Sequence, residues 1–168
     1  MTKDMNPSMI SAYTEKDSPV MEEADLLSEL EALEHHGDFT HTLVTEKLLH
    51  TFEKEIGHRL PEQYRRFLKE FGEGGILGAF VILGVNDIRE PVFLKASREY
   101  RPFGLPKELI IIEECDDNWN YCLNVWTGKV VAWRIGTNIL SNEYDSFYDY
   151  LEGRMKEALE TAGALGVS

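Results

Sequence analysis

The first half of the chain carries apolar residues at helical spacing. Four leucines between residues 26 and 33 share one helical face and predict a short amphipathic helix that ends near Gly37. Thr45 is placed to cap a second helix, and Gly57 is placed to close it. The apolar face of the second helix is formed by Leu48, Leu49, Phe52 and Ile56. Two helices are therefore expected before residue 60.

The segment from Leu60 to Gly75 has the strongest local pattern in the sequence. Pro61 suits the first position of a helix because its φ is already helical, and Glu62 suits the positive end of the helix dipole. One buried face is then predicted from positions i, i+3, i+4 and i+7, which are Tyr64, Phe67, Leu68 and Phe71. Three glycines stop the helix and permit a sharp turn: Gly72, Gly74 and Gly75. The segment predicts a helix, a glycine turn and a strand.

After residue 75 the pattern changes to apolar runs and alternation, which indicate strands. One strand is predicted over Ile76–Val85 and another over Leu109–Ile112. Residues 119–126 alternate, residues 127–129 contain a turn glycine, and residues 130–134 are again apolar, so a β-hairpin is expected. Trp133 alternates with Val131 and is predicted to lie in the core, whereas the pattern leaves the place of Trp126 open.

The remaining pattern completes an α+β order of elements. Residues 87–107 contain three prolines among charged and aromatic residues, so a loop or a short helix is expected there. Ser146 is placed to cap a closing helix, whose apolar side comprises Phe147, Tyr148, Leu151, Met155 and Leu159. The sequence thus predicts N-terminal helices, a mostly antiparallel twisted sheet and a closing C-terminal helix.

Composition indicates one domain. Residues 1–22 are polar and lack periodicity, so we expect a flexible N-terminal leader, followed by a single domain over residues 23–168. Lys and Arg number 17 against 30 for Asp and Glu, which gives a net charge of −13. Such a charge disfavours direct binding of nucleic acid or an anionic membrane and attracts basic partners, although solubility alone also explains it.

The sequence offers no sign of export or of membrane insertion. No stretch approaches the roughly 18 apolar residues of a membrane-spanning helix. Residues 1–23 also lack the apolar core of a signal peptide, so a cytoplasmic protein is expected. Cys115 and Cys122 flank the expected turn near Asp117 out of register, which makes a disulfide improbable and favours a filling role for both side chains. The oligomeric state is left unknown.

Two clusters that invite a chemical interpretation are better explained structurally. The glycine-rich stretch 72–78 follows a helix instead of opening one and lacks the Lys-Ser/Thr ending of a phosphate-binding loop. His35, His36 and His41 match no zinc spacing and fit an exposed connection. His50 and His58 have no nucleophile at a recognisable spacing. We therefore predict no catalytic residue, no metal site and no cofactor.

The stretch from Glu113 to Tyr121 is the densest polar feature of the sequence. It places four carboxylates and two aromatic residues between two strands, which fits a solvated acidic turn, a recognition surface or, with poor ligand spacing, a calcium loop. If it is a recognition surface, the candidate partner-binding residues are Glu113, Glu114, Asp116, Asp117, Trp119 and Asn120, with Glu73 at the periphery.

The order of these motifs closely resembles the SUKH superfamily, the Smi/Knr-like family, over roughly residues 42 to 160. The resemblance is carried by Leu60-Pro61-x-x-Tyr64-x-x-Phe67-Leu68, Gly72-x-Gly74-Gly75, Ile82-Leu83-Gly84, Tyr121-Cys122-Leu123, Val131-x-Trp133 and Ser146-Phe147. Within the family the Cys-Leu pair is commonly followed by Asp, where this chain has Asn124. The departure removes one carboxylate from that position.

The resemblance implies an α+β fold without enzymatic activity. In the bacterial branch it implies an immunity protein, a cytosolic antitoxin that binds and blocks a polymorphic toxin, often a nuclease. The net charge of −13 is consistent with occlusion of a basic, nuclease-like active-site surface. The alternative is a regulatory interaction module similar to the fungal cell-wall synthesis regulators. An enzyme would require a pocket of convergent titratable groups, which the sequence does not reveal.

Overall fold

The computed structural model describes residues 26–35 and 37–164, so the predicted leader over residues 1–22 lies outside the described residues. Residues up to 33 and those from 34 onward form two compact units, and each is described by itself. In the first unit, residues 26–33 are helical, as the leucine pattern predicts. The elements below all belong to the second unit. The single domain over residues 23–168 stays a prediction.

Helix α2 (Glu46–Ile56) begins and ends at the residues that the sequence indicates, and helix α3 (Glu62–Phe71) begins one residue later than predicted. The side chain of Thr45 accepts a hydrogen bond from the backbone N–H of Leu48, and Gly57 closes α2 in the left-handed conformation. Pro61 lies one position earlier than predicted, at the N-cap of α3. The predicted apolar face of α3 is buried: Tyr64, Phe67, Leu68 and Phe71.

The strand predicted over Ile76–Val85 is wrong, because the chain folds there into a short hairpin. Strands β2 (Gly74–Ile76) and β3 (Phe80–Ile82) pair antiparallel. The reversal lies at Leu77 and Gly78, both of which have positive φ. Three residues of turn break an apolar run that looks continuous in the sequence. Beyond the hairpin, Leu83 donates its backbone N–H to the carbonyl of Ile112, 2.8 Å away.

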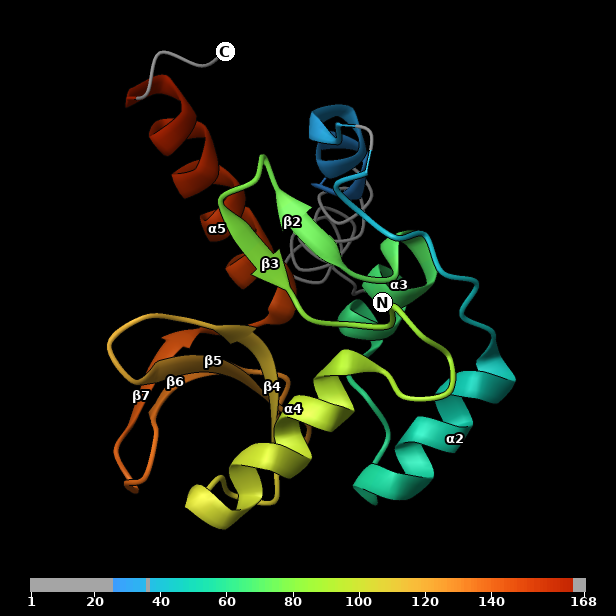
Figure 1. The fold of residues 1–168 in the computed structure, drawn as a ribbon, viewed down its shortest axis with the longest axis vertical. Coiled ribbons are helices and arrows are strands. Elements are labelled where there is room, and N and C mark those ends of the chain that lie inside the picture. Colours follow the sequence, from blue (N-terminus) through green and yellow to red (C-terminus); the bar gives the residue numbers. More distant parts are fainter. Residues whose placement is uncertain (1–25, 36, 165–168) are drawn as a thin grey trace, which may run out of the picture. The chain divides into compact units, whose positions relative to one another are not determined.

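A four-stranded antiparallel sheet with strand order β4-β5-β6-β7 forms the second half of the fold (Figure 1). Its strands are β4 (Leu109–Glu114), β5 (Trp119–Asn124), β6 (Val130–Arg134) and β7 (Leu140–Tyr144). The predicted hairpin is β5–β6, with Tyr121 opposite Ala132. Strand β7 was not predicted. The sheet is visibly twisted and curved in the view of Figure 1.

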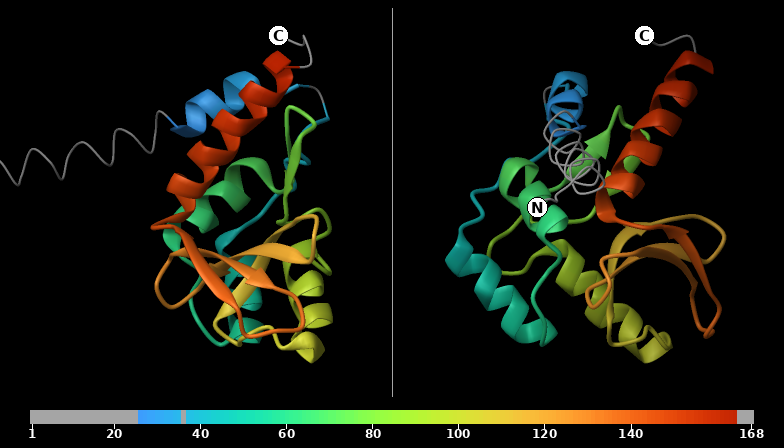
Figure 2. Two further views of the ribbon diagram at one scale, coloured as in Figure 1. Left: turned by 90° about the vertical axis from the view of Figure 1, so that its left-hand side faces the viewer. Right: turned by 180° about the vertical axis from the view of Figure 1, so that it is seen from behind.

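Two helices cover the sheet from opposite sides. Helix α4 (Val92–Tyr100), followed by the 3-10 turn η1 (Arg101–Phe103), fills the segment where a loop or short helix was expected. The ring of Tyr100 in α4 meets Trp133 edge-on, and Trp133 is fully buried as predicted. Ser146 caps the closing helix α5 (Phe147–Ala164) by accepting from the N–H of Asp149. Figure 2 shows α5 running away from the sheet beyond its first turns.

The core lies between α3, α4, α5 and the sheet. Tyr64 makes edge-on contacts with Phe93 of α4 and Phe147 of α5, and its hydroxyl donates to the carbonyl of Leu83. This one buried tyrosine therefore connects α4 and α5 to the segment that follows the β2–β3 hairpin. The described elements form an α+β protein with a C-terminal helix, which confirms the predicted fold class.

Candidate functional site: an open groove on the four-stranded sheet

The two faces of the sheet differ in how completely they are covered. Side chains of directly paired residues lie on the same face, so Asn120, Trp133 and Leu140 share the face on which α4 packs. Tyr121, Ala132 and Ser141 share the other face, where α5 lies. Helix α5 covers part of that face, where Tyr150 and Arg154 contact Tyr121 and Glu113 and where Gly153 lies against the ring of Tyr144. The rest of the face is open.

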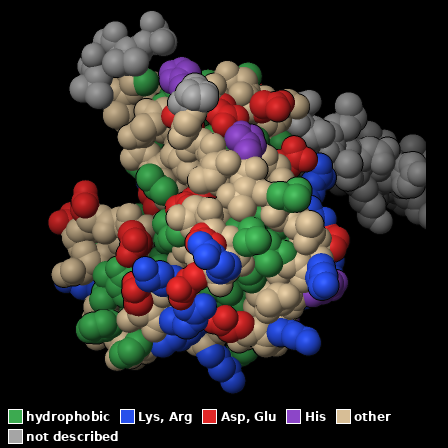
Figure 3. Space-filling view, turned by 45° about the vertical axis from the view of Figure 1, so that its right-hand side comes forward, with side chains coloured by type: hydrophobic (Ala, Val, Ile, Leu, Met, Phe, Trp, Pro, Cys, Tyr) green, Lys and Arg blue, Asp and Glu red, His purple; other side chains and the backbone are tan. Residues whose placement is uncertain are grey.

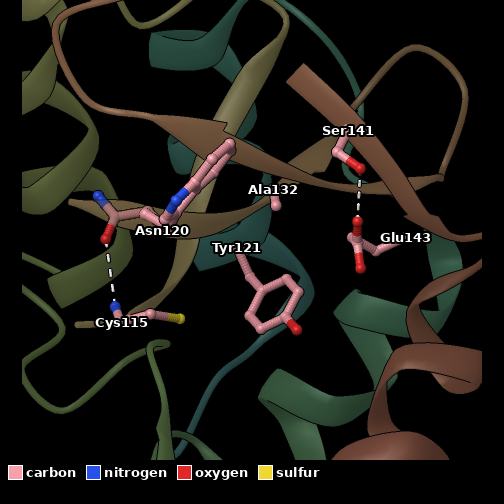
Figure 4. Close-up of a pocket in the computed structure, with 7 residues that line it drawn as sticks. Cys115, Asn120, Tyr121, Ala132, Ser141 and Glu143 are labelled. Atoms are coloured by element: carbon pink, nitrogen blue, oxygen red, sulfur yellow. Dashed lines mark hydrogen bonds between the residues drawn. The ribbon is translucent and has the colours of Figure 1, made fainter. Parts of the chain in front are cut away.

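The open part forms a groove of about 320 Å³. It is lined by Cys115, Trp119, Asn120, Tyr121, Ala132, Ser141 and Glu143. Figure 4 shows the hydrogen-bonded pair of Ser141 and Glu143 on one side and the pair of Cys115 and Asn120 on the other, with Tyr121 and Ala132 between them. The small side chain of Ala132 at the centre explains why the surface is hollow there.

A buried ion pair closes the groove toward α5. Both carboxylate oxygens of Glu113 on β4 receive hydrogen bonds from the guanidinium of Arg154, at 3.0 and 2.7 Å. The hydroxyl of Tyr150 donates to the same carboxylate at 2.7 Å. The guanidinium also lies over the rings of Phe80 and Tyr121. Burial raises the pKa of Tyr121 to about 12, so its hydroxyl is protonated at neutral pH.

The open end of the groove carries exposed polar groups. The hydroxyl of Ser141 donates to the carboxylate of Glu143 at 2.6 Å. The guanidinium of Arg134 lies 5.7 Å from the ring centre of Trp119, its partner across β5 and β6. Asp116 and Asp117 are exposed in the turn directly before Trp119. The groove therefore combines aromatic walls with carboxylates at its rim.

Two of the sequence-based candidates are not on the surface. Glu113 is 4% exposed and is used internally by Arg154, and Asn120 is 1% exposed, with its side-chain oxygen accepting from the N–H of Cys115. The interpretation of these two residues as surface contacts is corrected for this physical reason. Successive residues of a strand point to opposite faces, so an acidic run through a strand cannot be a single exposed cluster.

The other candidates are accessible but do not all meet. Glu114 is exposed on the α4 side, where its carboxylate accepts from the hydroxyl of Tyr100 at 2.8 Å. Trp119 lines the groove, with Asp116 and Asp117 beside it in the chain. Glu73 precedes β2, is not among the groove residues, and has a pKa raised by its partial burial. The structure therefore brings together the acidic turn and Trp119, and leaves Glu73 apart.

Sequence reasoning missed the groove residues on β6 and β7. Ala132, Ser141 and Glu143 line the groove with Tyr121, but β7 shows no apolar alternation in the sequence because its residues are exposed or half-exposed and mostly polar. A signal for β7 was available in the segment after β6, because Ile135-Gly136-Thr137-Asn138 favours a chain reversal after a strand. A reversal there would have placed the next segment beside β6.

The described residues offer little for catalysis. Burial raises the pKa of the Cys115 thiol to about 12, which keeps it protonated and weakly nucleophilic at neutral pH. His41 contacts the carboxylate of Glu34 at 2.6 Å and the carbonyl of Glu70 at 2.9 Å, away from the groove. Within residues 26–35 and 37–164, no group of three or more His, Cys, Asp or Glu side chains is arranged to hold a metal ion.

None of the described helices is both long and apolar enough to cross a membrane. Among the charged groups on the face that carries α2 and α4, both signs are intermixed (Figure 3). Ion pairs join Arg98 to Glu55 and Glu90 there, and Arg89 pairs with Asp87. The charges of this face are therefore largely matched by neighbours of opposite sign.

Fold and site together define an α+β protein with one half-covered sheet and an open, aromatic groove beside an acidic turn. The family model described as SUKH_5, SMI1-KNR4 cell-wall, matches residues 23–156, and the chain belongs to this family. This confirms the resemblance noted from the motifs. Membership places the chain among immunity and regulatory domains without specifying a partner.

A solved structure supports the fold. The chain is similar to a protein from Pseudomonas syringae pv. tomato, with a TM-score of 0.63 and 19% sequence identity. The match covers 77% of this chain and 95% of the other. At this identity the likeness concerns the arrangement of helices and strands and carries no statement about what either protein binds.

Proposed function

We propose that this chain is a non-enzymatic immunity protein, an antitoxin that binds a cognate polymorphic toxin in the cytoplasm and occludes its basic, nuclease-like active-site surface. The observation that carries the proposal is the open groove with Trp119 and Tyr121 in its walls, next to the exposed carboxylates of Asp116 and Asp117. Tryptophan and tyrosine are typical anchors of protein interfaces, and clustered carboxylates guide a basic partner to them.

The distribution of charge supports a protein partner of positive charge. Asp87, Glu55 and Glu90 on the α2–α4 face pair with arginines, whereas no ion pair joins Asp116, Asp117 or Glu143 to a cation among the described residues. Excess negative charge is thus available at the groove. A nuclease binds its polyanionic substrate through Lys and Arg, so this surface is complementary to the site that such a toxin needs for activity.

A non-enzymatic role agrees with the state of the groove's polar groups. The thiol of Cys115 and the hydroxyl of Tyr121 are protonated at neutral pH, and neither has a histidine among the groove residues. The hydroxyl of Ser141 does contact a carboxylate, that of Glu143, but a carboxylate is a weaker general base for a hydroxyl than the histidine that usually activates one. The groove therefore suits recognition better than bond-breaking chemistry.

The second candidate is a regulatory interaction module that docks on proteins of cell-wall synthesis. It is favoured by the description of the matching family, SMI1-KNR4 cell-wall. A regulator of this kind uses the same open face but binds several partners, whereas an immunity protein binds one toxin tightly. The number of partners therefore separates the two functions.

The test begins with affinity capture of the tagged full chain from its own cell lysate at low salt, with elution at high salt and identification by mass spectrometry. The expected result is one basic partner that degrades nucleic acid when purified and loses this activity at one equivalent of the immunity protein. Several unrelated partners without such an activity would support the regulatory module instead. A captured nuclease that stays fully active in the complex would contradict occlusion.

A further inference from the structure

We propose that the groove is a subsite for a single arginine side chain of the partner, with the guanidinium held between aromatic walls and the carboxylate of Glu143. This inference rests on the proposed function, since it names the chemistry of the residue that the partner inserts. It goes further because it assigns a recognition role to Ala132, Ser141 and Glu143, which the acidic turn does not include.

The shape of the groove suits one extended side chain. Its floor is Ala132, which faces Tyr121 on one neighbouring strand and Ser141 on the other. A larger residue at this central position would fill the space, so the hollow depends on the methyl group of alanine. The volume of about 320 Å³ is open to solvent, which allows a side chain to enter from a docked protein.

The aromatic walls already bind guanidinium groups of this chain. Arg134 lies 5.7 Å from the ring centre of Trp119, and Arg154 lies 5.1 Å from that of Tyr121. Neither arginine is among the residues that line the groove. A planar guanidinium stacks on aromatic rings more readily than a compact ammonium does. The same chemistry therefore favours arginine over lysine as the occupant.

The carboxylate of Glu143 supplies the charge complement. It is exposed and accepts one hydrogen bond, from the hydroxyl of Ser141, which fixes its position at the groove wall. No ion pair to Glu143 is found within residues 26–35 and 37–164. A carboxylate that is held by a neutral donor and lines the same groove as two aromatic rings is a suitable acceptor for the N–H groups of a guanidinium.

The net charge of the surroundings also favours a cation: of the two guanidinium groups at the aromatic walls, Arg154 is neutralised by Glu113, and Arg134 has no such ion pair among the described residues. Asp116 and Asp117 precede Trp119, and the whole chain carries −13. Arg134 is the opposing group, because its positive charge lies next to the same ring. The variant Arg134→Gln should therefore bind an arginine probe more tightly than the natural chain does.

The test uses small probes and needs no toxin. The full chain labelled with ¹⁵N is titrated at constant ionic strength with N-acetyl-arginine amide, and the indole N–H signal of Trp119 is followed by NMR after assignment with Trp119→Phe. N-acetyl-citrulline amide is the neutral isostere, and N-acetyl-lysine amide carries the same charge without the planar group. We expect arginine to bind about fivefold more tightly than citrulline and also more tightly than lysine.

Matched variants locate the binding. Glu143→Gln removes the charge but keeps an acceptor for Ser141, and should weaken arginine binding by about threefold. Ala132→Leu should abolish it by filling the groove. Glu152→Gln is the control for net charge, since Glu152 is exposed on α5 and does not line the groove, and should leave binding unchanged. The fold of each variant is checked by its full set of amide signals.

The outcomes separate this inference from the proposed function. Equal binding of arginine and citrulline, binding that ignores Glu143→Gln and Ala132→Leu, or no shift of Trp119 would each overturn the arginine subsite. If the captured nuclease is still inhibited in that case, the immunity function stands and uses other contacts. If arginine binds as expected but no toxin is inhibited, the subsite stands and the immunity function is lost.

Discussion

Glu113 and Glu114 are neighbours in the chain but have different environments. Glu113 is buried against Arg154 and Tyr150, whereas Glu114 is exposed on the other face of the sheet. Sequence reasoning treated both as members of one acidic surface. Strand alternation places the two on opposite faces, but which of them points inward depends on the register shift between Ile111 and Glu113, and that irregularity has no clear pattern in the sequence.

The buried pair of Glu113 and Arg154 gives a prediction about stability. Glu113→Gln leaves the guanidinium of Arg154, which is 6% exposed, without its buried charge partner, so that only the exposed carboxylate of Glu157 still pairs with it. Removing one member of a buried ion pair typically costs about 3 kcal/mol, and we expect a loss of this size in the free energy of unfolding measured with urea. The double variant Glu113→Gln, Arg154→Met should be more stable than Glu113→Gln, because no unpaired charge remains.

The control for this measurement is Glu157→Gln. Glu157 also bonds to Arg154, at 2.7 Å, but its side chain is 56% exposed. An exposed pair contributes about 0.5 kcal/mol or less, so this variant should be nearly neutral. If Glu113→Gln and Glu157→Gln lower the free energy of unfolding equally, burial does not make the pair of Glu113 and Arg154 more important for stability than an exposed pair.

At the scale of elements, the helices were the most predictable part. Their caps at Thr45, Gly57 and Ser146 are local signals, and the structure confirms each of them. The small hairpin β2–β3 and strand β7 were missed for opposite reasons. The hairpin is hidden inside one apolar run, and β7 is too exposed to need apolar residues, so neither shows the period that defines a strand.

The junction between α3 and the loop after β3 gives the second prediction. A Cβ added to Gly84 would collide with the carbonyl oxygen of Gly72 and come within 2.9 Å of Leu68. The backbone there cannot move freely, because the same carbonyl accepts from the N–H of Val85. We expect Gly84→Ala to lower the free energy of unfolding by about 2–3 kcal/mol, measured by urea denaturation.

The matched control is Gly136→Ala. Gly136 has φ +79, but a Cβ there meets no atom within 4 Å, so the variant tests backbone strain without a collision. Its expected cost is about 1 kcal/mol. A Gly84→Ala protein as stable as Gly136→Ala would show that the close approach of the two backbone segments is relieved easily.

At the scale of the whole molecule, charge was predicted in amount but not in location. The sequence gives −13, while the structure shows that Glu55 and Glu90 on the α2–α4 face are paired and that Asp116, Asp117 and Glu143 near the groove have no cationic partner among the described residues. Pairing depends on residues far apart in the chain, such as Glu55 and Arg98, and cannot be deduced from composition. Electrostatic guidance of a partner depends on this location.

The third prediction concerns that guidance. The variant Asp116→Lys, Asp117→Asn changes the charge of the turn by +3, and asparagine is chosen because residue 117 has φ +60, which it tolerates well. Association with the captured basic partner should slow by about tenfold at low salt, and the difference should shrink at high salt. Surface plasmon resonance at several salt concentrations measures both effects, and the thermal midpoint should hardly change.

A control of equal charge is available on α5. The variant Glu152→Lys, Glu160→Gln also adds +3, at exposed positions that do not line the groove. If the effect is specific to the acidic turn, this control should slow association much less than the variant Asp116→Lys, Asp117→Asn does. If both variants slow it equally, only the total charge matters and the acidic turn has no special role.

The half-covered sheet has a consequence for how related chains can differ. The part of the face under α5 holds buried groups such as Glu113 and Tyr150, and a change there disturbs packing. The open part is bounded by Ala132, Ser141 and Glu143, which contribute little to the core. New side chains at these three positions would alter the depth and charge of the groove on an unchanged framework. One scaffold could in this way serve a series of different partners by exchanging a few residues on two adjacent strands.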